Sequence, residues 1–298
     1  MKRIILILIS CLSFASVQGQ TYVYHEGRET VAHVLALNFE SNFDLSVSVL
    51  RDVKRPFDPD DVVMAVGLSS FKTVCEQPNI PNVIAVFVGE EEFYSAAESC
   101  IGQASAVFSG APVALRLQVL NSFWEGRSPI AFIYSKALPV QTEVIRVEAE
   151  RLGREVNFVA VEEGRAASLR SLSSALEESD LVMSVYDSEL FDSQFSKDAI
   201  RLMFQKKKLF SAHSLQLVKA GALFALYSST SRKLEAVADQ LQSFEQSSRL
   251  LPPAYPAGLQ VVFNPYLIRM YGLVLPTDAF LLSEFGVCPE SGCEEPLY

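Results

Sequence analysis

Short apolar, β-branched runs alternate with amphipathic stretches along almost the whole chain. Such unbroken runs are typical of parallel strands buried on both faces. The strand–helix–strand order predicts an α/β fold with right-handed crossovers. We expect strands at residues 45–50, 62–66, 83–88, 130–134, 156–161, 181–186, 222–227 and 259–263.

Helical spacing of apolar residues occurs between several of these runs. We expect helices at 113–124, at 141–153 with a Gly cap, and at 231–244 with a Ser cap. With 298 residues, 49% hydrophobic and 20% charged, the chain can bury sizeable cores. That length fits one large domain or two lobes of about 120–150 residues each.

The pattern of strands and helices is interrupted at 105–112, 228–232 and 251–258, and Gly and Pro mark the first and third of these breaks. Three breaks predict several crossings between two lobes rather than one linker. We therefore divide the chain into a signal peptide (1–19), a first α/β lobe (20–108), a second α/β lobe (109–228) and a C-terminal segment that crosses back between the lobes (229–298).

The first 19 residues have the three parts of a secretory signal: Lys2 and Arg3, a short apolar stretch, and an exit at Val17-Gln18-Gly19. We expect export to the periplasm with cleavage near Gly19. The alternative is a lipoprotein, because residues 8–11 match a lipoprotein box ending at Cys11, although the preceding signal would be unusually short.

The net charge of −10 argues against nucleic acid and anionic membrane surfaces as partners. Loss of the signal peptide leaves 23 basic against 35 acidic residues, a net charge of −12. The remaining apolar runs are too short to span a bilayer, and we expect a monomer.

Cleavage near Gly19 leaves four cysteines, and an even number in an exported chain favours disulfides. Cys288 and Cys293 enclose Pro289-Glu290-Ser291-Gly292, whose turn chemistry suits a small disulfide loop (288–293). Cys75 and Cys100 are then left for each other. Zinc is the weaker alternative, since C-x4-C lacks the second ligand pair of a structural site, and we expect no metal.

The C-terminal third resembles the end of the ABC-transporter substrate-binding protein family, the stand-alone type that includes aromatic amino-acid binders. The similarity lies in Gly221-Ala222-Leu223 with its strand, a helix, a proline-rich connection, a strand ending at Asn264, then Gly272 and Pro276. Weaker matches extend it over roughly residues 62–276, at 61–67, 80–88, 127–135 and 180–188. Only their order and spacing carry the resemblance.

This resemblance implies two Rossmann-like lobes with parallel sheets flanking a ligand cleft, the periplasmic binding protein type I-like fold. It also implies binding of a small ligand without covalent chemistry. The chain departs from the family pattern at its short first strand (21–24) and at the crossing 108–112, where many members are rich in Gly and Asn.

A search for catalytic motifs finds no G-x-S-x-G, H-E-x-x-H, G-x-x-x-x-G-K or G-x-G-x-x-G sequence. The chain has three histidines, His25, His33 and His213, so acid–base or metal chemistry has few candidate residues. We expect neither enzymatic activity nor a cofactor. His213 alone is retained as a site candidate, because it follows a possible strand end at 209–211.

Ligands of open parallel sheets bind beyond the carboxyl ends of the strands, and that rule selects the other site candidates. In the first lobe, Gly67, Ser69 and Ser70 follow one strand, while Gly89 and Glu90 follow the next. The serines would hold an anion at a helix start or only cap that helix. Glu90 would hold an amine or only complement the helix dipole.

In the second lobe, Tyr134 follows one strand, and Tyr186 and Asp187 follow another. The tyrosines would stack on a ligand or belong to the core. Asp187 would pair with an ammonium group or cap a helix.

The leading hypothesis is an exported binding protein that captures a small organic ligand, such as an amino acid or small carboxylate, for an ABC permease. The alternative is a periplasmic sensory or accessory protein that docks on a membrane receptor or histidine kinase. An enzyme is a distant third, because no nucleophile–base pair can be named.

Overall fold

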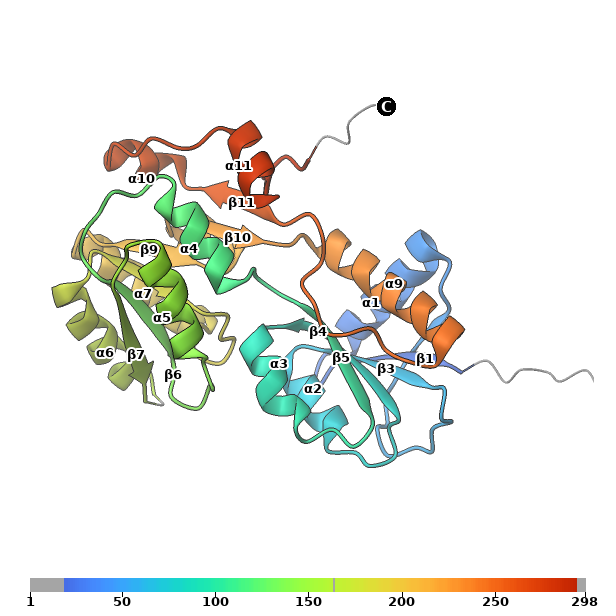
Figure 1. Ribbon diagram of the computed structural model, residues 1–298. Coiled ribbons are helices and arrows are strands. Elements are labelled where there is room, and N and C mark those ends of the chain that lie inside the picture. The colour runs from blue at the N-terminus through green and yellow to red at the C-terminus, as the bar shows by residue number, and fades with distance from the viewer. Residues whose placement is uncertain (1–18, 163, 294–298) are drawn as a thin grey trace, which may run out of the picture.

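A computed structural model describes residues 19–162 and 164–293, and within them the strands form two sheets (Figure 1). The first sheet has the order β2-β1-β3-β4-β5, and all its pairs are parallel. Its strands are β1 (Thr21–Tyr24), β2 (Val47–Val49), β3 (Val62–Val66), β4 (Asn82–Val88) and β5 (Gln103–Phe108). The short β1 is nevertheless internal, between β2 and β3.

Helices cover both faces of the first sheet, which explains why β3 is apolar at every position. Val63 and Ala65 pack beneath α2 (Leu68–Cys75) and α3 (Glu90–Ala97). Val62 and Met64 point the other way, beneath α1 (Glu29–Phe43) and α9 (Thr230–Ser247). Alternate side chains of a strand point to opposite faces, so both sets of side chains are buried.

The second sheet has the order β12-β11-β10-β9-β8-β6-β7. Its strands are β6 (Ile130–Ser135), β7 (Val156–Val161), β8 (Leu181–Ser184), β9 (Leu209–Ala212), β10 (Phe224–Tyr227), β11 (Gln260–Phe263) and β12 (Cys288–Pro289). One face packs on α4 (Val113–Asn121), α5 (Thr142–Arg151), α10 (Pro265–Met270) and α11 (Asp278–Phe285). The other packs on α6 (Arg165–Glu178), α7 (Ser193–Gln205) and α8 (Leu215–Ala220).

The predicted fold class, two α/β lobes with parallel sheets, is confirmed, with three differences in detail. β11 runs antiparallel to β10. β5 and β9 are full strands, although the sequence marked one as part of a crossing and the other as a strand end. Both contain Ser and Ala rather than a run of β-branched residues, so their intrinsic preference for β structure is weak. Pairing with a neighbouring strand stabilises them as strands.

Within the described residues the chain passes between the lobes three times (Figure 1). The passages join β5 to α4, β10 to α9, and α9 to β11. The last one also covers the edge of β5: Ala254 forms a parallel bridge with Val107, and the Ser105 hydroxyl donates to the Leu251 carbonyl at 2.6 Å. Covering an edge strand removes a surface on which other chains could pair.

The cysteines lie in the two predicted pairs, each at disulfide distance. The Cα atoms of Cys75 and Cys100 are 4.2 Å apart, and those of Cys288 and Cys293 are 5.0 Å apart. The first pair joins the end of α2 to the turn after α3, and the second closes a small loop after β12.

The predicted signal peptide and Cys11 lie outside the described residues, apart from Gly19 itself. Among the helices in the described part of the chain, none has the length and hydropathy needed to cross a bilayer.

Candidate ligand-binding cleft

The two lobes enclose a pocket of about 590 Å³ at the passages between them. Its walls come from both lobes: Phe87 and Ser109 from the first lobe, Tyr186 and His213 from the second, and Lys233 from α9. Most of these residues follow the carboxyl ends of strands, where open α/β sheets bind ligands. A shallower hollow of about 520 Å³ adjoins it in the first lobe and shares Phe87.

Phe87 enters this pocket because β4 is irregular at that point. Its φ is +61°, in the left-handed region that bulky residues avoid, and the pairing with β5 shifts between Val86 and Val88. A bulge of this kind re-aims a side chain and is enriched beside functional sites. The result is an aromatic ring held at the wall of the pocket.

Lys233 brings a buried positive charge to the same wall. Its side chain is 9% exposed, and burial alone lowers the pKa of its ammonium to about 8. The ammonium nitrogen lies 5.1 Å from the centre of the Phe87 ring, a cation–π contact. No carboxylate among the described residues pairs with this ammonium. The cation–π contact with Phe87 is therefore the main interaction that stabilises the buried charge.

Two hydroxyl groups at the pocket lack a hydrogen-bond partner among the described residues. Ser109 and Ser228 are each 2% exposed, and both line the pocket. The Ser109 hydroxyl lies near the Tyr186 phenol, but not in hydrogen-bonding geometry. A buried polar group without a partner costs about 1–3 kcal/mol, which a ligand can recover.

Tyr186 and His213 form the second-lobe wall, with ring centres 4.8 Å apart. Tyr186 also presses against the first lobe: a Cβ added at Gly89 would lie 2.7 Å from its ring, and one at Gly110 3.3 Å. Gly110 also has a φ of +78°. Glycine suits this position for two reasons: it leaves room for the Tyr186 ring, and it adopts a positive φ without strain. Burial and the nearby Glu92 carboxylate raise the pKa of Tyr186 to about 12, so the phenol stays neutral.

His213 is held as a neutral ring. Burial and the Arg116 guanidinium lower the pKa of His213 to about 3, and its Nδ1 lies 2.9 Å from the Ser184 hydroxyl. Arg116 is 1% exposed and donates to the carbonyls of Ser184 and Ser211 without forming an ion pair within the described residues. The floor of the pocket therefore lies close to a second buried cation.

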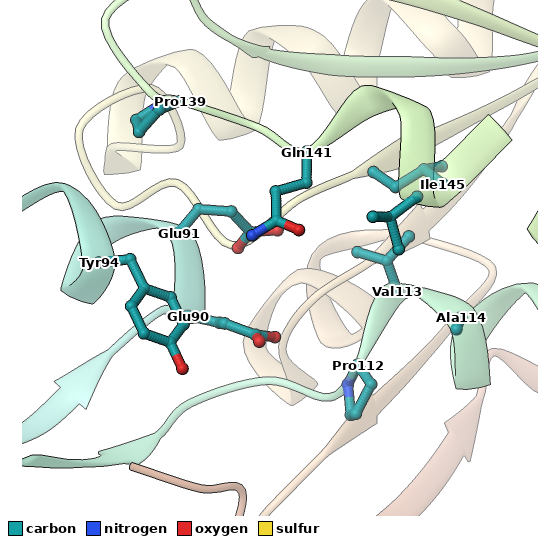
Figure 2. A pocket seen from close by; sticks show the side chains of 10 residues that line it. Glu90, Glu91, Tyr94, Pro112, Val113, Ala114, Pro139, Gln141 and Ile145 are labelled. Atoms are coloured by element: carbon teal, nitrogen blue, oxygen red, sulfur yellow. The ribbon is translucent and has the colours of Figure 1, made fainter. Parts of the chain in front are cut away.

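A smaller pocket of about 210 Å³ lies elsewhere between the lobes (Figure 2). Glu90, Glu91 and Tyr94 of α3 face Val113 and Gln141 of the second lobe, and the Gln141 and Glu91 side chains point toward each other. Burial raises the pKa of Glu91 to about 7, while the Tyr255 hydroxyl donates to Glu90 at 3.0 Å.

Two of the predicted site residues, Tyr186 and His213, line the larger pocket, and a third, Gly89, packs against Tyr186 without lining the pocket. Glu90 belongs to the smaller one, and Gly67 lines the adjoining hollow. Tyr134 packs against the second-lobe core.

The remaining predicted residues have structural partners. Ser69 donates to the Glu26 carboxylate, and the Ser70 hydroxyl accepts the Glu26 N–H at 2.9 Å. Asp187 is 2% exposed, and its two oxygens accept the backbone N–H groups of Ser135 at 2.7 Å and Leu190 at 2.9 Å. That is the geometry of a turn-capping carboxylate.

Four residues that line the larger pocket were not predicted from the sequence: Phe87, Ser109, Ser228 and Lys233. Lys233 had a local signal: a lysine in the first turn of a helix opposes the helix dipole, and such an exception often marks a function. Phe87 had none, because it lies inside an apolar strand run. No group of three or more His, Cys, Asp or Glu residues in the described ranges is arranged to hold a metal ion.

By sequence, the chain matches no family model and no curated protein. By structure, it is similar to the ABC domain in complex with L-Trp from Streptococcus pneumonia, at 13% identity over 91% of this chain and 99% of that chain, with a TM-score of 0.64. A conserved domain protein from Vibrio cholerae gives 13% identity, the same coverage and a TM-score of 0.62.

A ligand-free, open substrate-binding protein with adhesive properties from Clostridium difficile is also similar, at 12% identity over 91% of this chain and 98% of that chain, with a TM-score of 0.58. At such identities the likeness shows the fold. This chain has the two-lobe fold of the periplasmic, ABC-type solute-binding proteins, and the resemblance seen in the sequence is confirmed at that level.

Proposed function

We propose that the protein is an exported solute-binding protein that captures a small organic ligand between its lobes for delivery to an ABC transporter. The observation that carries this proposal is that Ser109 and Ser228 line the interlobe pocket and that their buried hydroxyls have no hydrogen-bond partner among the described residues. They lie on separate passages between the lobes, so one ligand bonded to both would favour closure.

The fold supports a binding role rather than catalysis. Structural neighbours include a complex with L-Trp and a substrate-binding protein. The pocket's histidine is held neutral, with a pKa of about 3, which suits a hydrogen-bonding wall better than a general base acting near pH 7.

A thermal-shift screen with amino acids, small carboxylates and sugars tests the proposal. A ligand at 100 times its dissociation constant should stabilise the protein by about 2.7 kcal/mol. The double variant Ser109→Ala/Ser228→Ala should weaken that binding. Ser179→Ala is the matched control, because its hydroxyl is equally buried and without a partner in the described structure, yet lies away from the pocket. Equal affinity in wild type and double variant would reject the site.

Export is supported by the two cysteine pairs, since disulfides persist in oxidising compartments. N-terminal sequencing of protein recovered from the periplasm should begin near Gln20. A lipid-modified Cys11 at the N-terminus would support the lipoprotein alternative instead. Neighbouring permease and ATPase genes would favour transport, whereas a neighbouring sensor-kinase gene would favour the sensory alternative.

A further inference from the structure

We propose that the interlobe pocket selects a small organic anion, such as a carboxylate, that carries no ammonium group. This inference rests on the proposed function, because it names the ligand class of the same pocket. It differs from what the family resemblance implies, since an amino acid carries both charges.

The first line of evidence is the placement of Lys233. It lies in the first turn of α9, where the helix dipole already contributes positive potential. Ser229 and Thr230 of the same turn line the pocket as well. The loss of hydration and the positive end of the helix both disfavour the charged ammonium of Lys233. An anion in the pocket would offset both effects.

The second line is the shortage of groups that would hold a cation. Among the lining residues, Glu290 is the one acidic side chain, and it is exposed. Asp187, the predicted partner of an ammonium, has both oxygens engaged by backbone N–H groups. A buried amine would therefore face Lys233 without a counter-charge.

The third line is the remaining chemistry of the wall. The Ser109 and Ser228 hydroxyls have no partner among the described residues and are able to donate to carboxylate oxygens, and three rings, Phe87, Tyr186 and His213, line the same pocket. Arg116, buried close to His213, adds positive potential and forms no ion pair within the described structure, although the Glu91 carboxylate lies near enough to act on its pKa. Polar donors around an apolar body are the arrangement expected of an organic-acid site.

Matched probes test the inference: 3-phenylpropanoate, phenylalanine and phenethylamine share one ring and differ in charge, and ribose serves as a neutral probe. Calorimetry should give the tightest binding for 3-phenylpropanoate, at least 10-fold tighter than phenylalanine, and none for phenethylamine. Lys233→Met should weaken the anion by about 10- to 100-fold. Arg232→Met is the control, because Arg232 is exposed and paired with Glu235 at 2.9 Å.

The outcomes separate the two proposals. Tighter binding of phenylalanine or ribose, unchanged in Lys233→Met, would overturn the anion inference and leave the solute-binding function standing. Binding of none of the probes at millimolar concentration would overturn the inference as well. If the wider solute screen also failed, the proposed function would fall with it.

Discussion

Glu92 of the first lobe and Ser188 of the second are joined directly: the Ser188 N–H donates to Glu92 Oε1 at 2.7 Å, and its hydroxyl donates to the same oxygen at 2.5 Å. The other oxygen, Oε2, accepts the Gly89 N–H at 2.9 Å at the start of α3. One buried carboxylate thus caps a helix and holds the lobes together. A second link, Lys72 to Glu189 at 2.8 Å, is exposed and contributes less.

Glu92→Gln should open the ligand-free protein. The amide keeps one acceptor and places an NH₂ group against N–H donors, so the bonds to Ser188 and Gly89 can no longer all form. We expect a larger radius of gyration by small-angle X-ray scattering, and a smaller increase for Ser188→Ala. Glu91→Gln is the control, since no hydrogen bond joins Glu91 to the described part of the second lobe. An unchanged radius in Glu92→Gln would show that this contact does not hold the lobes.

Asp187→Asn should destabilise the fold without changing ligand affinity. Both carboxylate oxygens accept backbone N–H groups, and asparagine can satisfy only one of them. We expect a loss of about 1–3 kcal/mol in urea unfolding. Asp192→Asn, at the exposed cap of α7, should cost less than about 0.5 kcal/mol, because Asn caps a helix about as well as Asp. Weaker binding with unchanged stability would instead place Asp187 in the site.

Lys233→Met should raise the stability of the ligand-free protein while weakening anion binding. Burial lowers the pKa of Lys233 from 10.5 to about 8, so the folded state carries the cost of the buried charge below pH 8. At pH 7 the variant should gain about 1–3 kcal/mol in its free energy of unfolding. Between about pH 8 and 10.5 the unfolded wild type binds more protons than the folded state, so wild-type stability rises and the gap should narrow. Urea titrations at pH 7 and pH 10 measure both; a constant gap would contradict the burial of this charge.

His213 should make the protein sensitive to mild acid. Its pKa falls from 6.5 to about 3 on folding, so the unfolded chain takes up a proton between these values and the folded protein does not. Stability is therefore lost as the pH falls below about 6.5. From pH 7 to pH 5 the wild type should lose about 2 kcal/mol relative to His213→Asn. Glu91, whose pKa is raised to about 7, acts in the opposite direction but is common to both proteins. Parallel pH profiles would refute the prediction.

The local pattern of apolar and polar residues was sufficient to predict most of the α/β architecture. The predicted strands at 62–66 and 156–161 coincide with β3 and β7. β3 is buried on both faces, and such a strand forms an apolar run that is visible without tertiary information. The order of these runs also supported the two-lobe class. The sequence placed β5 within a crossing and indicated only a possible strand end at β9, because Ala and Ser in those strands become β structure through pairing with neighbours far along the chain.

The chemistry of the cleft was decided by tertiary structure. The rule that ligands bind beyond strand ends selected both Tyr186 and Asp187. Tyr186 lines the pocket, whereas Asp187 caps a turn. Position after a strand does not specify which hydrogen bonds a side chain forms. Lys233 and Phe87 are 146 positions apart, although their side chains meet at 5.1 Å. That meeting depends on α9 returning to the first lobe and on the bulge in β4. Sequence spacing determined which elements form, and the packing of the lobes determined which polar groups were left for a ligand.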